Sequence, residues 1–176
     1  MARRFGWGVA DQAVSSLTNA AVSIYVAREL GAVQFGAFSL AYVTYSLVLN
    51  ASRGLATDPL TVRYSSAELP VWRRAVASSA GTALATGALA ALCVLGVAAV
   101  LNGTTKLAFV ALGMMLPGLM LQDSWRFAFF ALGRGGQACL NDTIWAAVMV
   151  PALVLLKLTH HSTVFTFVLA WGAAAN

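Results

Sequence analysis

The sequence predicts an all-α integral membrane protein that forms one domain, a bundle of about six transmembrane helices. Of its 176 residues, 60% are hydrophobic and only 10% are charged, and the mean hydropathy is +0.78. Soluble domains carry about 25% charged residues, so this chain has too little polar surface to coat a water-soluble globule. Long apolar runs separated by short polar connections indicate helices that cross the bilayer.

The individual spans follow from the length of the apolar runs. A helix needs about 20 mostly apolar residues to cross a bilayer. We expect transmembrane helices near residues 6–27, 35–57, 75–101, 107–132, 141–156 and 164–176. The third run is uncharged throughout, whereas the last two are short, and the sixth is expected to be truncated. Pro117 and Pro151 lie well inside the fourth and fifth runs and predict kinks there.

Basic residues are distributed unevenly between the two sides of the predicted bundle. The amino terminus and the second and fourth connections carry Arg3, Arg4, Arg63, Arg73, Arg74 and Arg134. The first, third and fifth connections carry Arg28, Lys106 and Lys157. Because cytoplasmic loops are enriched in Lys and Arg, the amino terminus is predicted to be cytoplasmic. These charges are scattered and not clustered on one face, so no nucleic-acid partner is expected.

Two of the predicted helices carry a polar stripe. The stripe of the first consists of Gln12, Ser16, Asn19 and Ser23. The stripe of the second consists of Ser39, Tyr42, Ser46, Asn50, Arg53 and Thr57. Both spacings keep to one helix face, and an unpaired polar group in hydrocarbon costs several kcal/mol. The stripes predict a water-filled cavity; the alternative is that small polar residues hold helices together.

Charged side chains gather in one layer near the predicted cytoplasmic ends of four helices. They are Asp11, Arg53, Asp58, Asp123, Arg126 and Asp142. A charge inside a membrane costs at least about 2.5–3.5 kcal/mol on insertion scales, and such residues usually mark a pathway. Asp123 and Arg126, at i and i+3, can touch on one helix face. The layer predicts a charged vestibule, and a local pair that anchors a helix end is the alternative.

Catalytic motifs are missing from the sequence. It has no HExxH motif and no metal-ligand cluster, and the glycine-rich stretch 133–136 lacks the GK[ST] of a phosphate-binding loop. Cys93 lies in an apolar run and Cys139 in a polar connection, so no disulfide framework is expected. We therefore expect a protein that is not an enzyme and that uses no cofactor or metal.

One long stretch resembles a known family. Residues 7–42, WGVADQAVSSLTNAAVSIYVARELGAVQFGAFSLAY, resemble the opening of polysaccharide exporters and lipid-linked oligosaccharide flippases of the multidrug/oligosaccharidyl-lipid/polysaccharide superfamily. The matching features are the polar first helix, R-x-L-G at Arg28–Gly31 and F-G-x-F at Phe35–Phe38. Residues 52–63 and 122–134 resemble the cytoplasmic ends of the family's helices two and four. The likeness implies a MATE-like fold, of which this chain would be the amino-terminal half.

The resemblance also implies a function. Family members move an undecaprenyl-linked saccharide across the bacterial cytoplasmic membrane by alternating access between two bundles. The implied partners are this substrate, membrane lipids and a second half, either the rest of a longer chain or another copy. Two alternatives stay open: a cation-coupled drug or small-solute antiporter of the same superfamily, and a non-transporting membrane component of a polysaccharide assembly system.

The charged layer and the stripes supply the candidate site residues. The hypothetical substrate-binding residues are Arg53, Arg126, Asn19 and Asn50, because guanidinium groups pair well with phosphate oxygens. The hypothetical gate or cation-coupling residues are Asp11, Asp58 and Asp123. Four acids against two bases leave the layer at −2, which disfavours a dianionic ligand. Coupling to a proton or a sodium ion would explain the excess of acids equally well.

Overall fold

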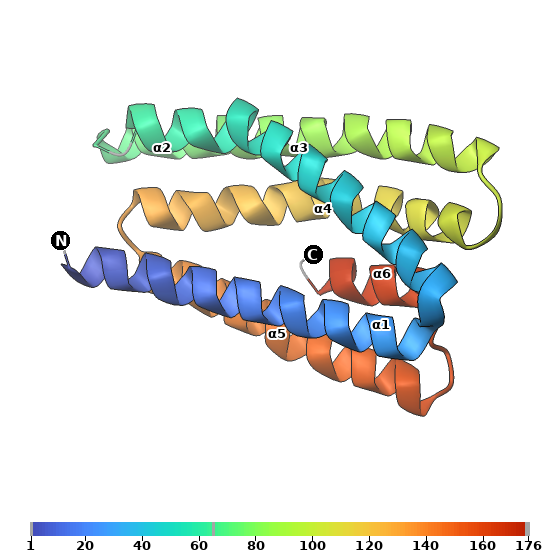
Figure 1. Ribbon diagram of the computed structural model, residues 1–176. Helices are drawn as coiled ribbons and strands as arrows, with labels where there is room; N and C mark the ends of the chain where they lie inside the picture. Colours follow the sequence, from blue (N-terminus) through green and yellow to red (C-terminus); the bar gives the residue numbers. More distant parts are fainter. Residues whose placement is uncertain (1, 65, 175–176) are drawn as a thin grey trace.

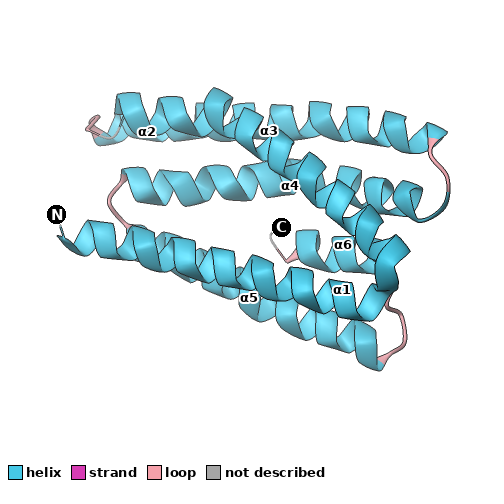
Figure 2. Ribbon diagram, in the orientation of Figure 1, coloured by secondary structure: helices cyan, strands magenta, loops and turns pink. Residues whose placement is uncertain are grey.

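The described part of the chain is helical throughout and contains no strand (Figures 1 and 2). The computed structural model describes residues 2–64 and 66–174; among residues 1–15, it describes only the side chain of Ala13. The elements are α1 (Ala2–Ser52), the π-helix η1 (Arg53–Thr57), α2 (Asp58–Tyr64), α3 (Leu69–Val100), α4 (Gly103–Ala131), α5 (Gly135–Leu158) and α6 (Val164–Ala173). The predicted all-α class is confirmed.

The expected count of about six spans needs correction. Four helical segments of the described chain are long and apolar enough to cross a membrane, namely Ser16–Tyr64, Leu69–Val100, Gly103–Ala131 and Gly135–Leu158. A fifth, Val164–Ala173, is apolar but shorter. The predicted spans 6–27 and 35–57 both belong to the continuous helical stretch 2–64, formed by α1, η1 and α2, because no loop separates them.

A single residue makes the turn between these two spans. Gly31 has φ 70° and ψ 170°, a conformation that side-chain-bearing residues rarely adopt. We call residues 2–30 the first arm of α1 and residues 32–52 the second arm. After Gly31 the second arm runs back over the bundle (Figure 1). The residues of the two predicted spans therefore lie on two arms of one helix, joined without a connection.

The predicted second connection, residues 63–74, is also shorter than expected. The α2 helix continues to Tyr64 and α3 begins at Leu69, so only residues 65–68 separate them. Pro70 lies in the first turn of α3, where a missing N–H costs nothing. The helices thus extend beyond the apolar runs into polar sequence, because hydropathy marks the part suited to hydrocarbon and not the whole helix.

The chain alternates between two ends of the bundle. The amino terminus and the connections 65–68 and 132–134 lie at one end (Figure 1). The turn between the two arms of α1 and the connections 101–102 and 159–163 lie at the other end (Figure 1). The first end therefore holds the arginine-rich segments on which the orientation prediction rests. Which end faces the cytoplasm stays a prediction.

Helix α4 lies at the centre and packs closely on α3. Leu112 and Leu116 of α4 are fully buried. Gly87 of α3 comes so close that an added Cβ would lie 2.8 Å from the Cα of Pro117. Small residues let membrane helices approach in this way. Many large apolar side chains remain on the outside, including Leu89 and Leu92, which are 66% and 68% exposed. Such a surface suits lipid.

Candidate functional site

A polar cavity lies where α1, η1, α4, α5 and α6 meet. Its volume is about 190 Å³. It is lined by Asn19, Tyr42, Tyr45, Ser46, Leu49, Arg53, Leu119, Gln122, Asp123, Arg126, Asp142, Trp145 and Trp171. Both arms of α1 contribute, so the turn at Gly31 brings Asn19 to the same cavity as Arg53 of η1. Polar and charged groups thus gather inside an otherwise apolar bundle.

The π-helix positions Arg53. In η1 the N–H of Asp58 donates to the carbonyl of Arg53, five residues earlier. Pro59 follows, and a proline ring inside an α-helix clashes with the carbonyl four residues before it, which the wider π turn relieves. The Ser79 hydroxyl of α3 donates to the Ala56 carbonyl at 2.9 Å and fixes this turn from outside. Single π turns often occur at functional sites.

Four charged side chains form an alternating ion-pair chain, defined here as Arg53, Asp123, Arg126 and Asp142. Arg53 holds Asp123 with two hydrogen bonds, Nε to Oδ2 at 3.0 Å and Nη2 to Oδ1 at 2.7 Å. Arg126 Nε lies 3.2 Å from Asp142 Oδ2, and its Nη1 lies 3.9 Å from Asp123 Oδ1. The expected i, i+3 contact exists, but each arginine approaches an aspartate of another element more closely.

The two aspartates of the ion-pair chain are buried, Arg53 is partly exposed, and the four charges are formally neutral. The side chains of Asp123 and Asp142 are only 8% and 6% exposed. Two arginines and two aspartates cancel, unlike the −2 predicted for the whole layer. Phenylalanine rings support both guanidinium groups: the Arg53 Cζ lies 5.0 Å from the Phe127 ring centroid, and the Arg126 Cζ lies 5.8 Å from that of Phe130. Cation–π contacts of this kind stabilise the guanidinium groups.

Aromatic side chains form another wall of the polar cavity. Tyr42 and Tyr45 of the second arm contact Trp171 of α6, with ring centroids 5.9 Å and 4.8 Å apart. Trp145 of α5 donates its Nε1–H to the Trp171 carbonyl at 3.2 Å. The sequence reasoning missed Tyr45, Trp145 and Trp171. A usable signal existed for Trp145, which follows Asp142 at i+3 and so shares its helix face.

Of the predicted substrate-binding residues, the structure brings three together. Arg53, Arg126 and Asn19 all line the polar cavity. Asn50 does not line it: its side-chain amide donates to the Ser46 carbonyl on its own helix, and the residue is exposed. At 3.6 residues per turn, Asn50 lies about 60° around the helix from Arg53, which turns it away from the cavity.

The predicted gate residues separate in the same way. Asp123 is the centre of the ion-pair chain. Asp58 is exposed and does not line the polar cavity. The side chain of Asp11 lies outside the part of the chain that the structure describes, as do those of Gln12 and Ser15.

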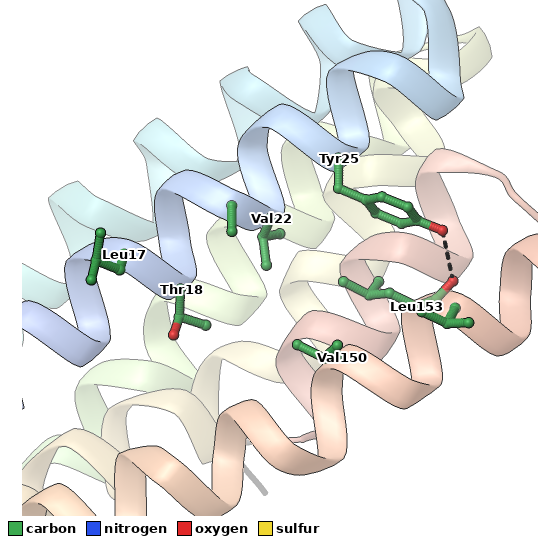
Figure 3. Close-up of a pocket in the computed structure, with 8 residues that line it drawn as sticks. Leu17, Thr18, Val22, Tyr25, Val150 and Leu153 are labelled. Atoms are coloured by element: carbon green, nitrogen blue, oxygen red, sulfur yellow. Dashed lines mark hydrogen bonds between the residues drawn. The ribbon is translucent and has the colours of Figure 1, made fainter.

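A second, larger hollow lies between the first arm of α1 and α5 (Figure 3). This apolar groove has a volume of about 380 Å³ and is lined by Leu17, Thr18, Ala21, Val22, Tyr25, Val150, Leu153 and Val154. At one point the Tyr25 hydroxyl crosses to donate to the Leu153 carbonyl at 3.3 Å (Figure 3). The lining offers no charged group, so we take the smaller polar cavity as the candidate site.

Comparisons with protein-family models, curated proteins and solved structures gave no match for this chain. The likeness to polysaccharide exporters therefore rests on the sequence features named above.

Proposed function

We propose that this chain is one bundle of a transporter that moves an undecaprenyl-linked saccharide across the bacterial cytoplasmic membrane. The observation that carries the proposal is the convergence of Arg53 and Arg126, from different elements, on a polar cavity inside an apolar bundle. Buried charge is costly in a membrane and usually serves a substrate or ion pathway. A diphosphate linkage is the part of such a substrate that guanidinium groups bind best.

Binding would proceed by exchange of ion-pair partners. Asp123 occupies Arg53 with two hydrogen bonds, so a phosphate group must displace this carboxylate to reach the guanidinium. Asp123 would then pair with Arg126, whose Nη1 already lies 3.9 Å from the Asp123 Oδ1. Without substrate, the neutral ion-pair chain would hold α4, α5 and η1 together as an inner gate. Proton or cation uptake by Asp123 or Asp142 would release an arginine in the same way.

Alternating access requires a second bundle to move against this one. The structure consists of one bundle, and the opposing half would be further sequence of the same protein or another copy of it. Membrane lipids would surround the exposed apolar face.

The decisive experiment is the replacement of Arg126 by Ala. We expect Arg126→Ala to abolish polysaccharide export in cells that lack the native copy, while the protein still inserts into the membrane. Arg134→Ala is the matched control, because Arg134 is exposed in the connection between α4 and α5. Normal export by Arg126→Ala would contradict the proposal.

A non-transporting membrane component is the second candidate, favoured by the complete pairing of the four charges. In that case the ion-pair chain is only a structural clamp between helices. Deletion of the whole chain would then leave export unchanged, whereas the transporter proposal requires export to fail.

A further inference from the structure

The apolar groove between the first arm of α1 and α5 has the size of an alkyl chain. On α1 its lining extends from Leu17 to Tyr25, and its volume is about 380 Å³. Eight residues of helix span about 12 Å, and a helix of that length with its side chains occupies roughly 1,000 Å³. The groove is therefore too small to take in a helix from a second copy or from another protein.

The lining of the groove suits hydrocarbon. Its side chains are apolar except for those of Thr18 and Tyr25, and the Tyr25 hydroxyl is bound to the Leu153 carbonyl (Figure 3). Water in the groove would find few hydrogen-bond partners, and a stable water site needs two to four of them. Both flanking helices are long and apolar enough to cross a membrane. At membrane depth, hydrocarbon is therefore the solvent that fills the groove best.

A charged pair lies just beyond one end of the groove. Lys157 of α5 and Glu29 of the first arm form an ion pair, one helical turn past Leu153 and Tyr25. The Lys157 Nζ lies 6.0 Å from the Tyr25 ring centroid. The Lys157 side chain is 53% exposed and that of Glu29 only 20%. The ammonium is thus the accessible member of the pair, and it can contact a phosphate oxygen.

The distance between the charged pair and the groove matches the shape of a phospholipid. Glu29 lies four residues beyond Tyr25 and twelve beyond Leu17, which corresponds to about 6 Å and about 18 Å along the helix. The hydrocarbon of one leaflet is about 15 Å thick, half of the bilayer core. An acyl chain whose phosphate lies beside Lys157 therefore runs along most of the groove.

We propose that the apolar groove binds one acyl chain of a membrane phospholipid whose phosphate contacts Lys157. The lipid belongs to the leaflet at the end of the bundle where the two arms of α1 join. Its chain fills the space between the first arm and α5, and so links two helices that line the polar cavity elsewhere. This site is separate from the polar cavity and does not depend on the transport proposal.

Native mass spectrometry of the purified full chain tests this site. The protein in detergent is titrated with dipalmitoyl phosphatidylglycerol, and we expect saturable retention of one lipid. Ala21→Trp fills the groove and should lower the affinity about 10-fold, the equivalent of roughly two buried methylenes. Ala20→Trp is the matched control and should leave the affinity unchanged, because Ala20 is exposed like Ala21 but does not line the groove.

Two further titrations test the two ends of the lipid. Dibutyryl phosphatidylglycerol keeps the phosphate, but its chains are too short to reach the groove, so it should not be retained. Lys157→Gln should lower the affinity for the dipalmitoyl lipid about 2–5-fold, as expected for a partly exposed ion pair. Lys106→Gln is its control, because it removes the same charge from an exposed residue that belongs to α4.

Several results would overturn the inference: no phospholipid is retained, both tryptophan variants weaken retention equally, the dibutyryl lipid binds as tightly, or Lys157→Gln changes nothing. Retention of a polyprenyl phosphate in place of phospholipid would also overturn it, as would a dimer that only Ala21→Trp disrupts. If Ala21→Trp does not insert, Val154→Trp replaces it, with Val148→Trp as the control. Both valines are about half exposed, and only Val154 lines the groove. The titrations involve no export, so this proposal and the transport proposal fail separately.

Discussion

At the scale of single residues, Asp123 determines the electrostatics of the candidate site. It accepts two hydrogen bonds from Arg53 and lies within ion-pair distance of Arg126. Removing one partner of a buried ion pair leaves an uncompensated charge and commonly costs about 3–5 kcal/mol, although the intact pair adds little net stability. Asp123 therefore adds little net stability as part of the intact pair, but its removal is expected to destabilise the fold.

We expect Asp123→Ala to lower the free energy of unfolding by about 3–5 kcal/mol. The thermal midpoint of the purified protein in detergent measures this. Asp58→Ala is the matched control and should change little, because Asp58 is exposed. The double variant Arg53→Leu/Asp123→Leu should recover much of the loss, since it removes both charges. A double variant as unstable as Asp123→Ala would contradict this account.

At the scale of elements, the contact between α3 and α4 depends on glycine. A Cβ at Gly87 would lie 2.8 Å from the Pro117 Cα and 2.9 Å from the Leu116 carbonyl oxygen, and both are backbone atoms that cannot move alone. Gly81, on the same helix, has nothing within 4 Å of such a Cβ. The two glycines thus differ only in what lies opposite them.

Alanine substitutions at these two positions should therefore have opposite effects. Gly87→Ala should destabilise the bundle by about 1–3 kcal/mol through overpacking. Gly81→Ala should stabilise it by about 0.5–1 kcal/mol, because alanine favours the helix. Thermal unfolding in detergent compares them directly. Equal effects at the two positions would show that the α3–α4 contact is looser than described.

At the scale of the whole molecule, successive connections alternate between the two ends of the bundle. Arg63, Arg73, Arg74 and Arg134 belong to the same end as the amino terminus, whereas Arg28, Lys106 and Lys157 belong to the other. The positive-inside rule predicts that the first end is cytoplasmic. If the bundle crosses the membrane, the two ends are expected to lie on opposite sides of it.

Single-cysteine labelling tests this arrangement in intact cells. In a chain whose Cys93 and Cys139 are replaced by alanine, a membrane-impermeant thiol reagent should label His161→Cys from outside. Ser66→Cys should react only after the cells are opened. The reverse pattern would invert the orientation, and labelling of both from outside would contradict the alternation itself.

The sequence allowed much of this organisation to be predicted, because composition and periodicity are local properties. Low charge and long apolar runs predicted helices suited to a membrane. The cost of burying polar groups singled out Asn19, Arg53, Asp123 and Arg126, all of which line one cavity. Helical spacing could not exclude Asn50. A rotation of the helix about its own axis by tens of degrees decides whether this residue faces the cavity, and spacing alone does not give that rotation.

Only the tertiary structure decided which groups meet. Arg53 and Asp123 are 70 residues apart, and neither helix alone specifies that they pair. The same holds for Trp171, whose position beside Tyr45 depends on how α6 packs against the second arm. The sequence by itself determined the helical class, a break between the first two spans within residues 28–34 and the candidate charges. Packing then selected the ion pairs and the aromatic wall, because contacts between helices depend on their crossing and rotation, which no single segment encodes.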